Sequence, residues 1–188
     1  LVADEIQSGM GRTGRWWASE HAAITPDIIC VAKGIASGLP LGAVIAPADL
    51  MSWPPGAHAS TFGGNPVSIA AALATIRLLE ERYLENARRL GDYLLARLAD
   101  WPARHRLVGE VRGRGLMIGL ELVRDQQTKE RAPEERNAVV RAAFERGLLV
   151  LGCGPNTLRL MPPLVINQEQ ADCALALLED ALSEVEKR

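Results

Sequence analysis

Two ionisable residues stand just after short apolar runs, and this placement indicates chemistry. Lys33 follows the β-branched run 28–31, and Asp4 follows the apolar residues 1–3, so an amine and a carboxylate lie at the mouths of two predicted strands. A desolvated amine acts as a nucleophile and as a base. Because ligands of open α/β sheets gather at the carboxyl ends of strands, we expect both groups to face one crevice. The simpler alternatives are a lysine that reaches out to solvent and an aspartate that caps a turn.

Two further segments offer groups that bind anions. Residues 60–66, Ser-Thr-Phe-Gly-Gly-Asn-Pro, place hydroxyls before a predicted helix start, where free N–H groups and the helix dipole attract phosphate. The alternative is an ordinary helix cap after a loop. Arg159 alternates with Leu158 and Leu160 and is predicted to point away from the face that they bury. Its guanidinium either binds a carboxylate through two parallel hydrogen bonds or is simply solvated.

Together these groups fit one cofactor. Pyridoxal 5'-phosphate (PLP) needs an amine for a Schiff base, a carboxylate for its pyridinium nitrogen and a site for its phosphate. An arginine for the carboxylate of the substrate completes the set. The sequence therefore predicts a PLP enzyme acting on an amino acid or a keto acid.

The composition excludes several other classes. The chain has 188 residues, 48% of them hydrophobic, with 21 basic against 23 acidic residues, which leaves no surplus charge for a nucleic acid partner. The longest weakly polar stretch, 35–48, is too short for the roughly 20 apolar residues of a membrane span. The histidines lack metal-ligand spacing, so we expect no metal site.

Cysteine usage and the first residues give two further expectations. Cys30, Cys153 and Cys173 have no CxxC spacing, which is typical of a reducing compartment and predicts a cytoplasmic protein. The chain opens on the end of an apolar strand, without an initiator methionine or a signal pattern, and we interpret it as a segment of a larger protein.

Strands and helices alternate along the sequence, which predicts an α/β fold. Asn65 followed by Pro66 marks a helix start, and Gly147 marks a helix end. The expected strands are 28–31 and 41–46, both buried, then 115–123, 148–151 and 157–161; the further helices are 84–98, 133–146 and 168–187. A soft domain boundary is expected near residue 80, giving domains 1–80 and 81–188.

Several separate segments resemble the class III PLP-dependent aminotransferases, in the order of that family. They are Asp4-Glu5-Ile6-Gln7-Ser8-Gly9-Met10-Gly11-Arg12-Thr13-Gly14, Pro26-Asp27-Ile28-Ile29, Ala32-Lys33-Gly34, residues 58–66, residues 112–119 and residues 158–164. The resemblance covers almost the whole chain and is nearest to the 4-aminobutyrate and related ω-amino acid aminotransferases.

The resemblance implies a fold and a role for each matched residue. It implies PLP-transferase fold type I, like aspartate aminotransferase, with 1–80 as the C-terminal part of the large PLP-binding domain and 81–188 as a small α/β domain. Lys33 would carry PLP as a Schiff base, Asp4 would pair with the pyridine nitrogen, and Gln7 would bind the phenolic oxygen. Thr61 would reach the phosphate held by a neighbouring subunit, which implies a homodimer with shared sites. Arg159 would bind the α-carboxylate.

The implied reaction moves an amino group from an ω-amino acid to 2-oxoglutarate. Relatives also have a large N-terminal portion with the main phosphate loop and the aromatic that stacks on the ring, and this chain lacks that portion. Two alternatives stay open. One is an amino-acid racemase on the same scaffold, since Lys33 and Asp4 serve both outcomes. The other is an inactive truncated remnant that acts as an interaction module.

Overall fold

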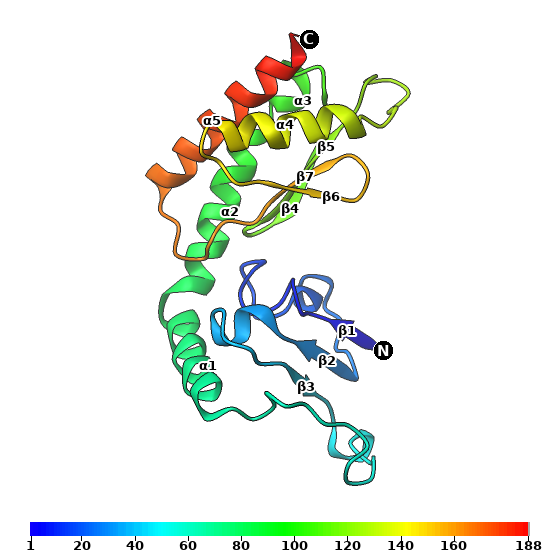
Figure 1. Cartoon of the computed structure of the whole chain (residues 1–188), viewed down its shortest axis with the longest axis vertical. Coiled ribbons are helices and arrows are strands. Elements are labelled where there is room, and N and C mark those ends of the chain that lie inside the picture. The colour runs from blue at the N-terminus through cyan, green and yellow to red at the C-terminus, as the bar shows by residue number, and fades with distance from the viewer. Residues whose placement is uncertain (188) are drawn as a thin grey trace. The chain divides into compact units, whose positions relative to one another are not determined.

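The computed structural model describes residues 1–187 and divides the chain into two compact units, 1–87 and 88–188 (Figure 1). Both combine helices with a β-sheet, which is an α/β architecture.

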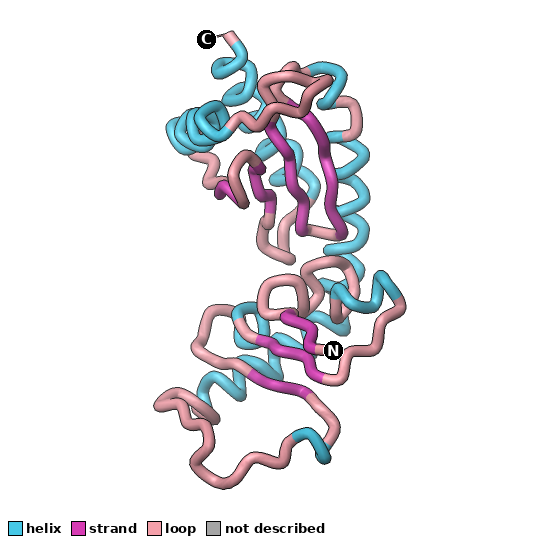
Figure 2. The backbone as a smooth tube through the Cα atoms, turned by 90° about the vertical axis from the view of Figure 1, so that its right-hand side faces the viewer, coloured by secondary structure: helices cyan, strands magenta, loops and turns pink. Residues whose placement is uncertain are grey.

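The first unit contains a three-stranded sheet in the order β1-β2-β3. β1 (Val2–Asp4) pairs in parallel with β2 (Ile28–Val31), and β2 pairs in antiparallel fashion with β3 (Ala43–Ile45). Three short 3₁₀ helices connect or follow these strands: η1 (Ala18–Ala22), η2 (Lys33–Ala36) and η3 (Ala48–Leu50). Figure 2 shows the strands and the long loops that join them.

The expectation that strands 28–31 and 41–46 are both buried is wrong. β2 is half-buried apart from the buried Val31, and in β3 the side chains of Val44 and Ile45 are about half exposed. A sheet of three short strands has little area, and β3 lies at its edge. The β-branched composition therefore predicted the strands correctly but not their burial.

The predicted helix start at Pro66 is confirmed. α1 (Pro66–Leu78) begins with the Asn65 side chain accepting hydrogen bonds from the backbone N–H groups of Val67 (2.9 Å) and Ser68 (3.3 Å). A π-helical turn, η4 (Leu79–Tyr83), leads into α2 (Leu84–Leu98), which matches the expected range.

The second unit is built on a four-stranded antiparallel sheet in the order β4-β5-β7-β6. Its strands are β4 (Val108–Arg114), β5 (Met117–Leu122), β6 (Leu151–Cys153) and β7 (Thr157–Leu160). Its further helices are the single turn α3 (Trp101–Arg104), then α4 (Pro133–Glu145) and α5 (Gln168–Glu186). α5 begins with a capping box between Asn167 and Gln170.

The core of this unit is closed and apolar. Trp101, Leu120 and Leu158 are at most 2% exposed, as are many other large side chains of the unit. The predicted inward stripe of the last helix is confirmed, because Ala171, Leu175, Leu178, Leu182 and Val185 are buried. None of the helices within residues 1–187 is long and apolar enough to cross a bilayer.

Two strands of this unit differ from the expectation. β4 was not predicted, because its glycines and charges conceal the alternation; Gly113 is needed there, since a Cβ would lie 2.6 Å from the carbonyl oxygen of Met117. The predicted bounds 148–151 are wrong, because β6 covers Leu151–Cys153. Leu148 instead donates its N–H to the carbonyl of Ala143 and so terminates α4. Ladder pairing begins only at Leu151.

Candidate active site

The first unit brings Asp4 and Lys33 to the same edge of its sheet. β1 and β2 run in parallel with Asp4 in register with Cys30, so the carboxyl ends of the two strands lie side by side. Lys33 comes three residues after Cys30 and opens η2. The predicted juxtaposition of an amine and a carboxylate at neighbouring strand ends is therefore present in the backbone arrangement.

The backbone of Lys33 is in the left-handed region, with φ +47°. Non-glycine residues rarely adopt this conformation, and strained positions of this kind cluster at functional sites. The next residue, Gly34, would place a Cβ 3.4 Å from the Cβ of Met10, which is buried and also left-handed. Ser37, which follows η2 directly, is joined to α1 by a 2.8 Å hydrogen bond between its hydroxyl and that of Thr75.

The environment of Lys33 corrects one expectation. The amine was predicted to be desolvated at the mouth of a buried strand, but the Lys33 side chain is exposed in this chain. The reason is the same as for β3: the three-stranded sheet and its loops do not enclose the end of β2.

The Asp4 side chain is exposed, and its Oδ1 accepts a 3.1 Å hydrogen bond from the backbone N–H of Ile6. This is the local turn that sequence reasoning gave as the simpler alternative, and it fixes one oxygen of the carboxylate. Gln7 follows in the same turn and is half-buried.

Sequence reasoning missed Glu5, which is only 3% exposed. Its carboxylate accepts hydrogen bonds from the Ser8 hydroxyl (2.5 Å) and from the backbone N–H of Ser19 (2.8 Å). Burial by itself would raise the pKa of Glu5, but these hydrogen bonds and one from the backbone of Ala18 outweigh it and lower the pKa below its usual value. The only sequence signal was an acidic residue followed three places later by a serine.

Thr61 lies on an exposed loop before α1. The phosphate hypothesis for this segment also invoked the N-terminus of the helix, but the Asn65 side chain already accepts from two of its N–H groups. The helix start is thus capped by the chain itself at those groups, and any phosphate contact predicted here rests on the Thr61 hydroxyl.

Arg159 belongs to the second unit, so the structure does not relate it to Lys33. It lies on β7, where its Cα is in register with Gly119 of β5 and with Leu151 of β6. Its side chain is half-buried, whereas the neighbouring Leu158 is fully buried. The alternation predicted for Arg159 therefore holds with respect to Leu158 but not Leu160, which is also only half-buried; Arg159 lies on an interior strand of the sheet.

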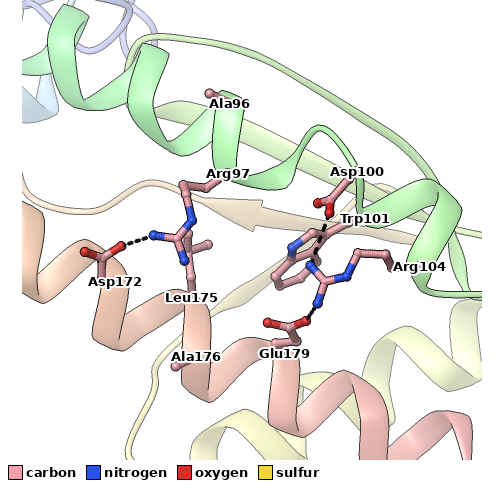
Figure 3. Close-up of a pocket in the computed structure, with 9 residues that line it drawn as sticks. All are labelled: Ala96, Arg97, Asp100, Trp101, Arg104, Asp172, Leu175, Ala176 and Glu179. Atoms are coloured by element: carbon pink, nitrogen blue, oxygen red, sulfur yellow. Dashed lines mark hydrogen bonds and ion pairs between the residues drawn. The ribbon is translucent and has the colours of Figure 1, made fainter.

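The second unit also has a pocket of about 300 Å³, shown in Figure 3, which includes none of the predicted site residues. Arg97 of α2 donates a 2.5 Å hydrogen bond to Asp172 of α5, and Arg104 of α3 donates to Glu179. These pairs join α5 to α2 and α3, which is a structural role. Within residues 1–187, no group of three His, Cys, Asp or Glu side chains is arranged to hold a metal ion.

The carboxyl ends of β1 and β2 carry the carboxylate of Asp4 and, three residues after Cys30, the amine of Lys33, as the sequence predicted. The sequence profile of the class-III aminotransferases matches residues 1–182, and the chain belongs to this family. The cofactor of the family is pyridoxal 5'-phosphate, and the residues present fit it, because Lys33 offers an exposed amine for a Schiff base and Asp4 an exposed carboxylate for the pyridinium nitrogen.

Particular relatives carry different activities in their names. The chain is 49% identical over its full length to a leucine/methionine racemase of Thermococcus litoralis. It is 40% identical over 98% of its length to an acetylornithine aminotransferase of Caldanaerobacter subterraneus and 46% identical over 98% to a 4-aminobutyrate aminotransferase of Mycobacterium leprae. The matched parts make up 43%, 45% and 42% of these relatives, so the chain spans less than half of their length.

A solved structure confirms the fold. The amine transaminase of an uncultivated Pseudomonas species, in its PLP-bound (internal aldimine) form, superposes with a TM-score of 0.89 at 36% identity over 98% of this chain and 44% of that one. The predicted PLP-transferase architecture is thereby confirmed.

Proposed function

We propose that the enzyme containing this chain moves an amino group from an ω-amino acid of the 4-aminobutyrate type to 2-oxoglutarate. The observation that carries the proposal is the placement of Asp4 and Lys33 at the carboxyl ends of two paired parallel strands. Membership of the class-III aminotransferases supports amino transfer, and the similarity to the M. leprae 4-aminobutyrate aminotransferase supports the substrate.

Lys33 has two roles in this proposal. When bound, PLP supplies a carbonyl carbon that bonds covalently to amines and a ring that accepts electron density. The Lys33 amine would hold the cofactor by that bond. When free of it, the same amine would act as the base that takes the proton from the substrate carbon, and its position at the start of η2 keeps it near the end of β2.

The other residues of the first unit orient the cofactor. The Asp4 carboxylate holds a proton on the pyridine nitrogen, which keeps the ring able to accept electrons. The Gln7 amide donates to the phenolic oxygen. Thr61 donates its hydroxyl to the phosphate held by the neighbouring subunit, so the enzyme is a homodimer in this proposal. Sedimentation of the complete enzyme tests the dimer, and a weaker PLP affinity of Thr61→Ala tests the contact.

Arg159 binds the carboxylate of the small-molecule substrates, the amino donor and the 2-oxo acid acceptor. Its guanidinium is planar and offers two parallel N–H donors, which match a carboxylate better than an ammonium does. Its place on an interior strand limits its movement, as binding of one orientation of the substrate requires.

Two measurements on the complete enzyme test this proposal. Borohydride reduction followed by peptide mapping is expected to place the pyridoxyl label on Lys33, and incubation with 4-aminobutyrate and 2-oxoglutarate is expected to yield glutamate. Label on Lys129 or Lys187 would overturn the Lys33 assignment. The absence of any label would favour the non-catalytic interaction module. If glutamate forms from N-acetylornithine and not from 4-aminobutyrate, N-acetylornithine would replace 4-aminobutyrate as the proposed amino donor.

A second candidate is an amino-acid racemase, favoured by the 49% identity to the T. litoralis enzyme. In that reaction the Lys33 amine, or another acid, returns the proton to the substrate carbon, and no keto acid is consumed. L-leucine or L-methionine supplied alone would then give the D-enantiomer. Formation of the D-enantiomer without glutamate would establish this candidate and leave the roles of Lys33 and Asp4 unchanged.

A further inference from the structure

Glu5 is a buried carboxylate placed between two residues of the candidate site. It follows Asp4 directly and precedes Gln7 by two positions, yet its side chain is 3% exposed whereas that of Asp4 is open to solvent. A buried carboxylate is retained only with hydrogen-bond partners, because its desolvation is costly.

The partners of Glu5 join three segments of the first unit. Its backbone N–H donates to the carbonyl of Cys30 (3.0 Å), which ties the end of β1 to the end of β2. Its carboxylate accepts from the Ser8 hydroxyl, across the turn, and from the N–H of Ser19, in η1. One residue thus fixes both strand ends, the turn after β1 and the first turn of η1.

The turn closed by Glu5 determines where the Asp4 carboxylate points. Asp4 Oδ1 accepts from the N–H of Ile6, which lies inside that turn. The turn is also tightly packed: the N–H of Gly9 donates to the carbonyl of Glu5 (3.0 Å), and a Cβ at Gly9 would lie 2.8 Å from that oxygen and 2.9 Å from Trp17. Movement of the Glu5 carboxylate would therefore displace the donor that orients Asp4.

We infer that Glu5 is a positioning residue, which holds Asp4 in place for the cofactor through its hydrogen bonds to Ser8 and Ser19. This inference rests on the proposed function, because it acts through the Asp4 contact with the cofactor. The lowered pKa of Glu5 is consistent with it, since an ionised carboxylate accepts from all of its donors at neutral pH.

The test compares Glu5→Gln with Glu20→Gln in the complete holoenzyme. Glu20 is a matched control, because it is exposed and accepts a 2.7 Å hydrogen bond from the N–H of Trp17 in the same region. For Glu5→Gln we expect about tenfold weaker PLP affinity of the apoenzyme and about tenfold lower kcat, by analogy with residues that orient metal ligands. KM for 2-oxoglutarate is expected to stay within about twofold, because Arg159 is untouched.

Hydrogen exchange of the apoenzyme gives a readout independent of activity. The amides of Ile6 and Gly9 are expected to exchange faster in Glu5→Gln than in Glu20→Gln. A lower Tm with unchanged PLP affinity, kcat and amide exchange would reduce Glu5 to a purely structural residue and overturn the inference. If Glu5→Gln does not fold, Ser8→Ala removes one donor only and is expected to change PLP affinity and kcat in the same direction by about threefold.

A double-mutant cycle with Asp4→Asn separates this inference from the proposed function. If Glu5 acts through Asp4, adding Glu5→Gln to Asp4→Asn should lower PLP affinity by less than about twofold further. The same tenfold loss in both backgrounds would overturn the positioning role. Borohydride labelling of Lys33 is independent of this cycle, so its failure would contradict the proposed function and not the coupling between Glu5 and Asp4.

Discussion

The two units of the chain differ in how their apolar residues are used. In the second unit the strands and helices enclose a core with fully buried residues such as Trp101, Leu120 and Leu158. In the first unit the buried apolar residues are few and mostly small, and large ones such as Val44, Phe62 and Leu73 are half exposed or more. The residues proposed for cofactor binding all lie in this less enclosed unit.

In the proposed function, chemistry and stability are divided between the units. The first unit orders its loops by local hydrogen bonds, such as those of Glu5 and Asn65, because it has little core to hold them. Exposed apolar surface of this extent usually marks a face that another segment or chain covers. The second unit holds Arg159 within a sheet that its own helices cover.

The largest effect is expected from the first unit. Lys33→Ala should lower turnover of the complete enzyme by at least about 10³-fold, because both the covalent attachment and the base are lost. The measurement is the rate of glutamate formation. Lys129→Ala is the control, since the Lys129 amine donates to the carbonyl of Gly109, far along the sequence in the second unit. Similar losses in both variants would contradict the division of roles.

Expressing the two units separately tests the comparison directly. We expect residues 88–188 to unfold cooperatively in urea as a monomer, because their core is closed. We expect residues 1–87 to bind a hydrophobic dye and aggregate, because their large apolar side chains are exposed. The 188-residue chain is expected to bind PLP poorly and to be inactive. A 188-residue chain that is monodisperse and active would contradict the expected difference between the two units.

Shortening a buried side chain measures how much the core contributes to the stability of the second unit. Leu158→Ala, at a fully buried position, is expected to lower the free energy of unfolding of this unit by about 3 kcal/mol. The control Leu149→Ala is expected to change it by less than about 0.5 kcal/mol, because Leu149 is 80% exposed. Urea unfolding of residues 88–188 provides both values, and equal losses would show that the core is not closed in solution.

Arg159 is the one point where the second unit is expected to contribute to substrate binding. Arg159→Lys keeps the charge but loses the planar pair of donors. The transition-state stabilisation calculated from kcat/KM for 2-oxoglutarate should therefore fall by about 2 kcal/mol. Arg141→Lys, at an exposed position on α4, is the matched control and should leave kcat/KM unchanged. Unchanged kinetics of Arg159→Lys with every acid substrate would return Arg159 to a solvated role.

The smallest effect concerns pH. Hydrogen bonds lower the pKa of Glu5 below 4.5, so its contribution to stability is present above about pH 4.5 and is lost as the pH falls through the lowered value. The Tm of Glu5→Gln should therefore fall less steeply with acid than that of the original chain. In the second unit the Arg112 guanidinium lowers the pKa of Glu121 in the same way. Parallel Tm curves for Glu5→Gln and the original chain would contradict the Glu5 contribution.

The sequence was most informative where a single residue type dictates local geometry. Asn65 and Pro66 predicted the start of α1, and apolar runs ending in Asp4 and near Lys33 predicted two neighbouring strand ends. β4 was missed because Gly113 is needed for a close backbone contact with Met117. Neither the alternation of apolar residues nor strand propensity reveals such a contact. The burial of Glu5 depends on Ser19, fourteen residues away, and such contacts exist only once the chain has folded.

The left-handed backbone of Lys33 has a consequence for the stability of the first unit. A non-glycine residue at φ +47° costs about 1 kcal/mol in folding, and glycine would adopt the same conformation without that steric cost. The backbone at this position thus favours glycine, and the lysine is the less stable choice for folding. The strain at Lys33 is therefore accounted for by the amine proposed to bind the cofactor, and not by any need of the fold.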